Sequence, residues 1–395
     1  MQWKTEALSD IAFMTSGGTP SKKNPEYYKD GTIPWVRSGE LENGAIRDTA
    51  IKITQTGLEA SSAKIFPKGT LLIALYGATI GKLGYLDIDA CTNQAVCGIF
   101  DNEKVSLKYL YYFLLLHRPN LVKQGVGGAQ PNISQTILKK MMVSYPVEKA
   151  EQLRIVGKIE ELLSKLDASV AELQTAKEKL KVYRQAVYSS VYEELCGLQP
   201  ITNFFEITGG LTKNSRRNEL PLQMPYLRVA NVYYNHLDLS EIKEIGVTEQ
   251  EIDRCLLEKN DLLFVEGNGS KAQIGRVAIW NGQIPKCLHQ NHIVKGRPLG
   301  NMLSEYALYY LISNEGRKQI VNVAKSTSGL YTLSTNKIKG LRVPYCDLND
   351  QKRILDDVKE KLSVYDSIEH TIDTSLQQVE ALRQSILKQA FEGGL

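Results

Sequence analysis

The chain has 395 residues, more than a single hydrophobic core usually serves, so its length predicts at least two domains. A hydrophobic fraction of 43% and a charged fraction of 23% are ordinary for a globular protein, and a formal net charge of +4 permits a polyanionic partner without requiring one. The sequence shows no apolar signal segment, no stretch long enough to cross a membrane and no Cys-x-x-Cys pair among its six cysteines, so we expect buried, reduced thiols, a cytoplasmic setting and no membrane contact.

Four segments of the first half of the chain recur in the same order in the second half. The offset between matched segments is 191 residues for the first two pairs, then 198 and 199 for the last two. Because this drift is small, we place the insertions that cause it in loops, where they are tolerated. A repeat of half the chain predicts two similar folding units. The matched pairs are 34–37 with 225–228, 68–75 with 259–266, 106–115 with 304–313, and 151–167 with 350–366.

Each half begins with a globular portion that mixes strand and helix patterns. Short β-type runs at 70–76 and 261–265 stand between glycine-rich turns and predict strands. Amphipathic segments at 106–116 and 304–312 predict helices, so the fold class is α+β. The expected boundaries are a first globular domain at 1–147, a first long helix at 148–195, a second globular domain at 196–346, and a second long helix at 347–392.

The two long helices show an apolar period of 3.5 residues, which is the pattern of a coiled coil. Lys177 and Arg184 interrupt the first seam. Glu369 and Arg383 interrupt the second, and polar residues at such positions can fix register. We expect the helices to pair antiparallel, as a rod of roughly 60 Å that separates two pseudo-twofold-related domains. The apolar seams consist of Ile159, Leu163, Leu166, Val170, Leu173, Leu180, Val187 and Val191, and of Val358, Leu362, Tyr365, Ile372, Leu376, Val379, Ile386 and Ala390.

Three segments resemble motifs of catalysis, cofactor binding or metal binding, but each lacks residues or spacing that the motif requires. The segment 77–84 (GATIGKLG) has three residues between its first two glycines where a nucleotide-binding P-loop has four, so we interpret it as a glycine-rich turn between strands. The segment 24–27 (NPEY) lacks the second proline of the Asn-Pro-Pro-Tyr motif of adenine-N6 methyltransferases, and no glycine-rich cofactor loop accompanies it. His289 and His292 have no recognisable set of further metal ligands. We therefore expect no catalytic site, no metal and no cofactor.

The remaining features favour recognition over catalysis. Tyrosine is abundant, with 20 residues against 8 phenylalanines, and supplies planar side chains with a polar tip. Several loops carry the amide, hydroxyl and basic groups that contact DNA base edges and phosphates. Their presentation at matching points of both halves suits a two-part target. These loops are 17–24, 127–135, 209–218 and 324–337.

A set of short motifs runs through the chain in a fixed and partly duplicated order. They are Trp3-Lys4, 8–11 (LSDI), 17–20 (GGTP), 33–37 (IPWVR), 71–73 ahead of Gly77, Asn93-Gln94 with Gln290-Asn291, Gln152 and Arg154 with Gln351 and Arg353, and 387–391 before Gly393-Gly394. On these residues the chain resembles, over nearly its whole length, the specificity (S) subunit of type I restriction–modification systems.

The resemblance implies two target-recognition domains, each reading one half of a split, asymmetric sequence in double-stranded DNA. It implies that the long helices space these domains and dock two modification subunits, which would bind S-adenosylmethionine and methylate adenine at N6. Restriction subunits would join to translocate and cut DNA, and the chain itself would be non-catalytic. Two other interpretations remain open: a coiled-coil scaffold without DNA readout, and a fused modification–specificity enzyme.

Within this family the DNA contacts are expected from the polar and basic residues of the duplicated loops. Basic side chains would meet phosphates, so their loss would lower affinity for any sequence, whereas Gln130 and Asn132 would hydrogen-bond base edges. Arg37 and Arg228 lie in strand-like runs, where a structural role explains them equally well. The candidate DNA-contact residues are Lys22, Lys23, Lys82, Gln130, Asn132, Lys213, Arg216, Arg217, Lys271, Arg276, Lys325 and Tyr331.

Overall fold

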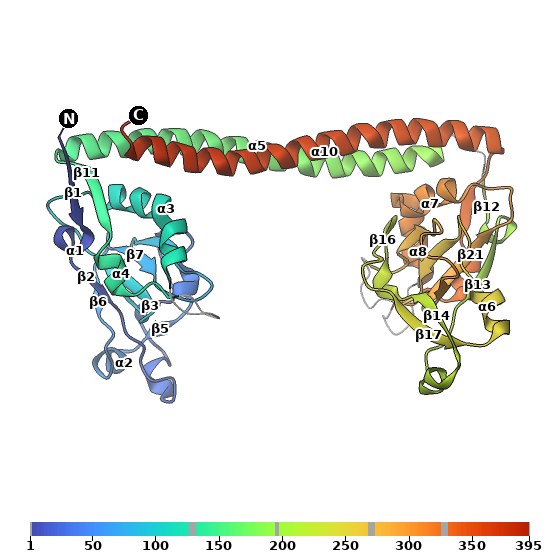
Figure 1. Cartoon of the computed structure of the whole chain (residues 1–395), viewed down its shortest axis with the longest axis horizontal. Helices are drawn as coiled ribbons and strands as arrows, with labels where there is room; N and C mark the ends of the chain where they lie inside the picture. The colour runs from blue at the N-terminus through green and yellow to red at the C-terminus, as the bar shows by residue number, and fades with distance from the viewer. Residues whose placement is uncertain (1, 126–131, 194–196, 268–272, 325–330, 395) are drawn as a thin grey trace. The chain divides into compact units, whose positions relative to one another are not determined.

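The computed structural model describes residues 2–394 apart from 126–131, 194–196, 268–272 and 325–330. The chain divides into two compact units, unit 1 (residues 1–172 and 374–395) and unit 2 (residues 173–373). Each unit holds one globular domain and one part of each long helix (Figure 1). Among the described residues, no helix combines the length and the apolar character that crossing a bilayer needs.

Helices α5 (Lys149–Glu193) and α10 (Leu348–Phe391) are the longest elements, with 45 and 44 residues. The start of α10 is capped by Asp347, whose Oδ1 accepts two backbone N–H groups of the first turn, both at 2.9 Å. Its end is followed by Gly393, which has φ of +81°, a left-handed conformation that glycine adopts without strain. Capping residues therefore set both limits of α10.

In each unit α5 and α10 lie side by side and run in opposite directions (Figure 1). In unit 1, Arg383 of α10 forms an ion pair with Asp167 of α5. In unit 2, Lys177 Nζ lies 2.5 Å from Asp373 Oδ1. The apolar seam residues are buried or half-buried, so the predicted coiled-coil pairing is confirmed within each unit. The polar seam residues Lys177 and Arg383 thus have partners on the opposite helix.

The globular domain of unit 1 is built on two sheets and a two-stranded ribbon. Its strands are β1 (Trp3–Ala7), β2 (Met14–Ser16), β3 (Ile33–Val36), β4 (Gly44–Ile46), β5 (Lys52–Ile53), β6 (Ile65–Phe66), β7 (Leu71–Ala74), β8 (Leu83–Leu86), β9 (Ala90–Thr92), β10 (Val96–Ile99) and β11 (Met142–Pro146). The sheet orders are β2-β10-β7-β8-β4 and β5-β3-β9-β6, in which only the β4–β8 and β3–β9 pairs are parallel. The β1–β11 ribbon leads directly into α5.

The helices of unit 1 are α1 (Leu8–Ile11), α2 (Gln55–Glu59), α3 (Leu107–Gln124), α4 (Gln135–Lys139), and the 3-10 helices η1 (Pro25–Tyr27) and η2 (Ser38–Glu40). Helix α3 packs between the larger sheet and the long helices (Figure 1). The rings of Tyr109 and Phe113 lie 5.0 and 5.4 Å from the ring of Phe391 on α10. Ile159 of α5 is buried in the same core, so both long helices complete the core of this domain.

The globular domain of unit 2 repeats this plan. Its strands are β12 (Leu198–Pro200), β13 (Phe205–Gly209), β14 (Leu222–Leu227), β15 (Val232–Tyr233), β16 (His236–Leu237), β17 (Lys243–Val247), β18 (Leu262–Val265), β19 (Val277–Ile279), β20 (Leu288–His289), β21 (Ile293–Pro298) and β22 (Arg342–Pro344). The sheet orders are β13-β21-β18-β19 and β17-β14-β20, with the ribbons β12–β22 and β15–β16. The β14–β20 pair is parallel, as is its counterpart β3–β9 in unit 1.

The helices of unit 2 are α6 (Glu249–Cys255), α7 (Ser304–Ile312), α8 (Asn314–Ala324), α9 (Thr335–Lys339), and the 3-10 helices η3 (Ile201–Asn203), η4 (Ser215–Glu219) and η5 (Val229–Asn231). Val187 of α5, Tyr306 of α7 and Val358 of α10 share one core. The domain therefore packs on both long helices, as in unit 1. Two repeated α+β domains with long paired helices confirm the predicted fold class.

A buried glutamine links each long helix to the domain that precedes it. Gln152 of α5 is fully buried and makes three hydrogen bonds. Its Oε1 accepts the backbone N–H of Ser106 at 2.8 Å, and its Nε2 donates to the carbonyls of Lys104 at 2.9 Å and Pro146 at 2.8 Å. The helix, the start of α3 and the end of β11 are thereby fixed together, because each of these buried groups finds its partner in this one amide.

Gln351 repeats these contacts in unit 2. Its Oε1 accepts the backbone N–H of Leu303 at 2.8 Å, and its Nε2 donates to the carbonyl of Cys346 at 2.9 Å. Leu303 therefore occupies the place of Ser106, an offset of 197 residues. The predicted pairing of Ser106 with Ser304 is wrong by one residue. That pairing aligned identical residue types in the two tyrosine-rich helices, whereas the hydrogen bonds align Ser106 with Leu303.

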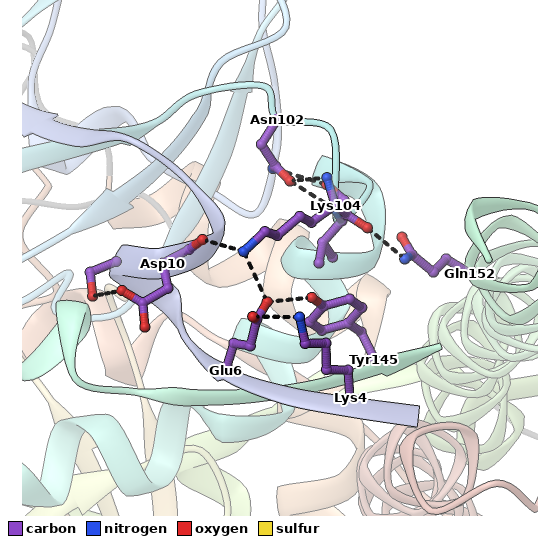
Figure 2. A network of polar contacts seen from close by, with 9 residues as sticks. Lys4, Glu6, Asp10, Asn102, Lys104, Tyr145 and Gln152 are labelled. Atoms are coloured by element: carbon purple, nitrogen blue, oxygen red, sulfur yellow. Dashed lines mark hydrogen bonds and ion pairs between the residues drawn. The ribbon is translucent and has the colours of Figure 1, made fainter. Parts of the chain in front are cut away.

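In unit 1 the glutamine lies beside a charged network (Figure 2). The carboxylate of Glu6 accepts hydrogen bonds from Lys4 at 2.8 Å, Tyr145 at 2.5 Å and Lys104 at 3.1 Å. The hydrogen bond from Lys4, with those from Tyr145 and Lys104, lowers the pKa of Glu6 to about 2. This network joins β1, β11 and the segment before α3, close to the first turn of α5.

The cysteines behave as expected of unreactive thiols. Four of the five described cysteines are buried, Cys346 is half-buried, and none of these five forms a disulfide. Cys196 lies outside the described residues. Burial raises the pKa values of Cys97 and Cys287 to about 12, so both remain protonated at neutral pH.

Candidate nucleic-acid interface

Two loops meet at the same place in each unit. In unit 1 the turn at 77–82 connects β7 to β8, and an isolated β-bridge joins Tyr76, just before this turn, to Asn132. In unit 2 an isolated bridge joins Gly267 to Thr332 in the same way. In each unit, a residue just after the central strand of the main sheet therefore bridges a residue just before α4 or α9.

In the turn at 77–82, the backbone N–H groups make local hydrogen bonds and are not available to bind a phosphate. Its N–H groups are used locally: Ile80 donates to Gly77 at 3.1 Å, Gly81 to Ala74 at 2.8 Å, and Lys82 to Thr79 at 2.9 Å. A P-loop needs such N–H groups free for the phosphates. The interpretation as a glycine-rich turn between strands is confirmed.

Close backbone approach explains the glycine that follows the first strand of each main sheet. A Cβ on Gly17 would lie 2.0 Å from the carbonyl oxygen of Thr92, and one on Gly210 would lie 2.3 Å from that of His289. Only glycine permits these contacts. Gly210 is therefore the counterpart of Gly17, and Leu211 takes the place of Gly18.

Polar side chains gather around these loops in unit 1. Gln135 Nε2 donates to Ser16 Oγ at 2.6 Å, and the hydroxyl of Thr19 donates to Oε1 of the exposed Gln94. The side chain of Gln94 also hydrogen-bonds the hydroxyl of Tyr76. Segments from four separate parts of the chain thus form one surface. We call it polar patch 1, and it consists of Ser16, Thr19, Tyr76, Asn93, Gln94, Asn132 and Gln135.

The same location in unit 2 is also polar, with different side chains. The N–H of Asn291 donates to the carbonyl of Leu211 at 2.9 Å, which holds the 290–291 segment beside the glycine turn. His292 is exposed, and its Nδ1 lies 3.3 Å from Oε2 of Glu266. We call this surface polar patch 2, and it consists of Glu266, Gln290, Asn291, His292, Thr332 and Thr335.

Buried polar atoms next to both patches have no hydrogen-bond partner among the described residues. In unit 1 these atoms are Thr92 Oγ1 and Asn93 Oδ1. In unit 2 they are Thr208 Oγ1 and His289 Nε2. Such atoms are uncommon in folded proteins because they lose hydration without compensation. Thr92 and His289 occupy the same position of the repeat.

His289 is buried beside polar patch 2 and holds an acceptor atom without a partner among the described residues. Its Nδ1 lies 2.7 Å from the carbonyl oxygen of Ile293, which can only accept, so Nδ1 carries the ring proton. Burial lowers the pKa of His289 to about 4, which keeps the ring neutral at pH 7. Nε2 is then an unprotonated acceptor.

These side chains suit the recognition of base edges. The amides of asparagine and glutamine donate and accept side by side, which matches the N6 and N7 positions of adenine. Gln94 in unit 1 and Asn291 in unit 2 present this group beside the glycine turns. The exposed Lys139 and Lys339 end the short helices that begin beside each patch, where they can contact phosphates.

Several predicted contact residues are accessible but lie on different segments. Lys22 and Lys23 are exposed on the loop before η1, and Lys213 and Arg216 are exposed before and within η4. Lys82 is half-buried at the end of the turn beside polar patch 1. Of the five, Lys22, Lys23 and Lys82 follow segments that contribute to polar patch 1.

Of the remaining predicted contact residues, two are described by the structure and three are not. Asn132 is exposed in polar patch 1. Tyr331 is half-buried and packs against the core of unit 2, beside Thr332 of polar patch 2. Gln130, Lys271 and Lys325 lie outside the described residues.

Arg217 and Arg276 have internal partners and are removed from the contact set. Arg217 is 9% exposed, and its guanidinium lies 2.7 Å from the carboxylate of Glu251. Arg276 is 7% exposed, stacks on the ring of Tyr233 at 5.0 Å and donates to the carbonyl of Val229 at 3.0 Å. The sequence placed both in polar loops, but their guanidinium groups stabilise the fold of unit 2.

Arg37 and Arg228, for which the sequence left both roles open, have structural contacts. Arg37 lies 3.6 Å from Glu40 at the start of η2. Arg228 lies 3.2 Å from Glu241 and donates to its backbone carbonyl at 3.1 Å. Their equivalent positions at the ends of β3 and β14 favour a role in fixing the loop that follows.

Sequence reasoning missed most of the patch residues. Ser16, Gln94, Gln135, His292 and Thr335 were not among the candidates. Ser16, Gln94 and His292 lie outside the four candidate loops, whereas Gln135 and Thr335 lie within two of them but were not selected. The available signal was the duplicated amide pair, Asn93-Gln94 and Gln290-Asn291, which was noticed only as part of the family resemblance. Among the described residues no group of three or more His, Cys, Asp or Glu side chains is placed to hold a metal ion.

Comparisons with known proteins agree on one family. The family model for the type I restriction modification DNA specificity domain matches the chain twice, at residues 1–182 and 199–380. The specificity subunit of the type I restriction enzyme EcoKI from Escherichia coli K12 is 27% identical over 420 residues, which cover 100% of this chain and 89% of that protein. The MjaIX specificity subunit from Methanocaldococcus jannaschii is 30% identical over 304 residues, 74% of this chain and 59% of that protein.

Solved structures share the fold. A chain from a structural study of complex assembly and conformational transition of the type I restriction–modification system has a TM-score of 0.74 with 17% identity, over 100% of this chain and 98% of that one. The HsdS subunit from Thermoanaerobacter tengcongensis has a TM-score of 0.57 with 17% identity, over 100% and 97%. With two matches that together cover most of the sequence, this chain belongs to the type I restriction–modification DNA specificity family and carries its specificity domain twice.

Proposed function

We propose that each globular domain reads one half of a two-part sequence in double-stranded DNA through its polar patch. The supporting observation is that the same loop junction recurs in both units with accessible amide side chains and with buried polar atoms that have no partner among the described residues. The side chains differ between the two patches, as domains that read different half-sites require. Nearby basic residues would hold the backbone and add affinity without sequence preference.

The patch residues are tested by mapping methylation in DNA after co-expression with the matching modification subunit. Gln94→Ala should relax the requirement at one or two positions of one half-site, because each lost bidentate contact removes about 1–3 kcal/mol of discrimination. Asn291→Ala should relax the other half-site. Lys82→Ala and Lys22→Ala serve as controls that lower affinity for any sequence and flatten its salt dependence. Unchanged methylated sequences in both amide variants would contradict the proposed reading surface.

We propose that catalysis lies in partner subunits and that this chain works with them in the cytoplasm. The EcoKI, StySPI and EcoBI relatives are each named as the specificity subunit of a restriction enzyme. By this analogy the partners are two modification subunits that methylate adenine and restriction subunits that cut DNA. The purified chain alone should transfer no methyl group from S-adenosylmethionine, and adding the modification subunit should restore transfer. Transfer by the chain alone would contradict the proposal.

We further propose that the long helices set the gap between the two half-sites. Their near-equal lengths and the shared seam support this role. Deleting one heptad from each helix, 171–177 together with 370–376, preserves the seam and removes about 10 Å of helix. The preferred gap should then shrink by about three base pairs at 3.4 Å each, or activity should be lost because the half-sites rotate relative to each other. A folded variant that keeps the original gap and the original rate of methylation would exclude the proposal that the long helices set the gap.

A further inference from the structure

A cavity of about 760 Å³ lies in unit 2, where the globular domain meets the long helices. Helices α5, α7, α8 and α10 and the hairpin β15–β16 contribute its walls. Its charged lining residues are Arg184, Arg317, Lys359 and Asp366, three basic groups against one acidic group. This volume lies in the range of small-molecule sites, which is about 300–1,000 Å³.

Two arginines of this cavity have no carboxylate partner among the described residues. The guanidinium carbon of Arg184 lies 5.0 Å above the ring of Tyr365, and its Nε is buried without a hydrogen-bond partner. Arg317 lies 4.9 Å above the ring of Tyr234 and donates only to backbone carbonyls, those of Ile274 and Gly275. Stacking fixes the plane of each guanidinium and leaves N–H groups available for a planar or tetrahedral anion.

Unit 1 contains the equivalent cavity with the opposite charge. Its volume is about 540 Å³, and its charged lining residues are Glu160, Asp167, Glu380 and Arg383, three acidic groups against one basic group. Arg383 is the counterpart of Arg184, but it is neutralised by its ion pair with Asp167. Glu160 stands where unit 2 has Lys359. The uncompensated positive charge is therefore found in the cavity of unit 2, and packing of the domain on the long helices does not require it, because unit 1 packs in the same way without it.

We propose that the cavity of unit 2 is a binding site for a phosphate group, carried either by a small molecule or by the DNA backbone. Two stacked arginines with free N–H groups match the several oxygens and the double negative charge of phosphate. Lys359 adds a third positive charge at the rim, although its Nζ also lies 2.6 Å from Glu305. This site is separate from the polar patches and goes beyond the reading of DNA sequence.

The test measures binding of pyrophosphate to the full chain by calorimetry, with chloride of equal ionic strength as the reference. Wild type should bind, and Arg184→Gln should bind roughly ten- to a hundredfold more weakly, because a charge-assisted hydrogen-bonding pair is lost. Arg184→Lys keeps the charge and should retain part of the affinity. The matched control is Arg383→Gln, the same change at the equivalent position of unit 1, which should leave pyrophosphate binding unchanged.

A second measurement separates the two sources of phosphate. If the site serves the DNA backbone, Arg184→Gln lowers affinity for duplex DNA of any sequence and reduces the salt slope by about one. If it serves a small molecule, DNA affinity stays the same and only pyrophosphate binding falls. The proposal is overturned if wild type and Arg184→Gln have the same affinity for pyrophosphate and the same affinity for duplex DNA. It is also overturned if only assembly with the modification subunit is weakened, which would assign the cavity to an acidic protein segment.

Discussion

The two units share the buried glutamine of each long helix and differ in the exposed ion pair between domain and helix. Gln152 and Gln351 make matching hydrogen bonds in the two cores. A buried polar group without its partner costs about 1–3 kcal/mol, so both copies retained these residues. Solvated groups carry a smaller cost, and there the copies diverged.

The diverged contacts include a reversed ion pair between domain and helix. In unit 1, Lys108 of α3 lies 3.0 Å from Glu160 of α5. In unit 2, Glu305 of α7 lies 2.6 Å from Lys359 of α10, and each residue is the counterpart of one with opposite charge. The geometry of the junction is thus independent of which side carries the positive charge. The polar patches also differ between the two units, and under the proposed function this difference sets which half-site each domain reads.

Exchange of one domain should have the largest effect. Replacing residues 1–147 by the corresponding domain of a homologue should change one half of the methylated sequence completely and leave the other half intact, because each patch is formed within one unit. Methylation mapping after co-expression with the modification subunit measures both halves at once. A simultaneous change in both half-sites would show that the units do not read independently.

Removal of the buried glutamines should have the next largest effect. Gln152→Leu leaves one N–H and two carbonyls unpaired and should lower the free energy of unfolding by about 2–4 kcal/mol. Gln351→Leu leaves fewer groups unpaired and should cost somewhat less. Chemical denaturation with hydrogen exchange locates the loss in the altered unit.

The exposed Gln377 on α10 provides the control for these substitutions. Gln377→Leu should change stability by less than about 0.5 kcal/mol. Equal losses from the control and from Gln152→Leu would show that the buried amide contributes no specific stabilisation.

A smaller effect, confined to unit 1, should come from Glu6→Gln and should depend on pH. The folded chain lowers the pKa of Glu6 from 4.5 to about 2, so its carboxylate stabilises the folded state above pH 4.5 and this contribution is lost as the pH falls towards 2. The difference in melting temperature between wild type and Glu6→Gln should be largest near neutral pH and should shrink below pH 4.5. Gln199 is the counterpart in unit 2, and Gln199→Ala should show no such dependence. A difference that is constant from pH 7 to acid would contradict the role of the charge.

Reversal of the ion pair should have the smallest effect. The side chains of Lys108 and Glu160 are 58% and 42% exposed, so Glu160→Lys should cost less than about 1 kcal/mol. Adding Lys108→Glu recreates the polarity of unit 2 and should recover most of that loss. The coupling is measured by a double-mutant cycle in denaturant at low and high salt. A loss that persists in the double reversal would show that packing of the Glu160 side chain matters more than its charge.

The sequence by itself determined the repeat, the coiled-coil helices, the α+β class and the family. These features depend on local periodicity and on the order of motifs, which survive divergence because apolar burial requires them. The sequence also located the general loops but placed the matched segment around Ser106 one residue out of register. Identical letters were aligned there, whereas hydrogen bonds and backbone contacts define the true equivalence.

Only the tertiary structure decided which polar residues share a surface. Gln94, Ser16 and Gln135 are far apart in sequence and meet because β2 and β10 are neighbours in one sheet and α4 begins beside β2. Arg217 and Arg276 looked like contacts for DNA, but the fold buries both beside internal acceptors. The sequence shows an arginine in the same way whether its side chain faces solvent or a buried carboxylate. Which of the two it faces depends on strand pairings that no local sequence pattern encodes.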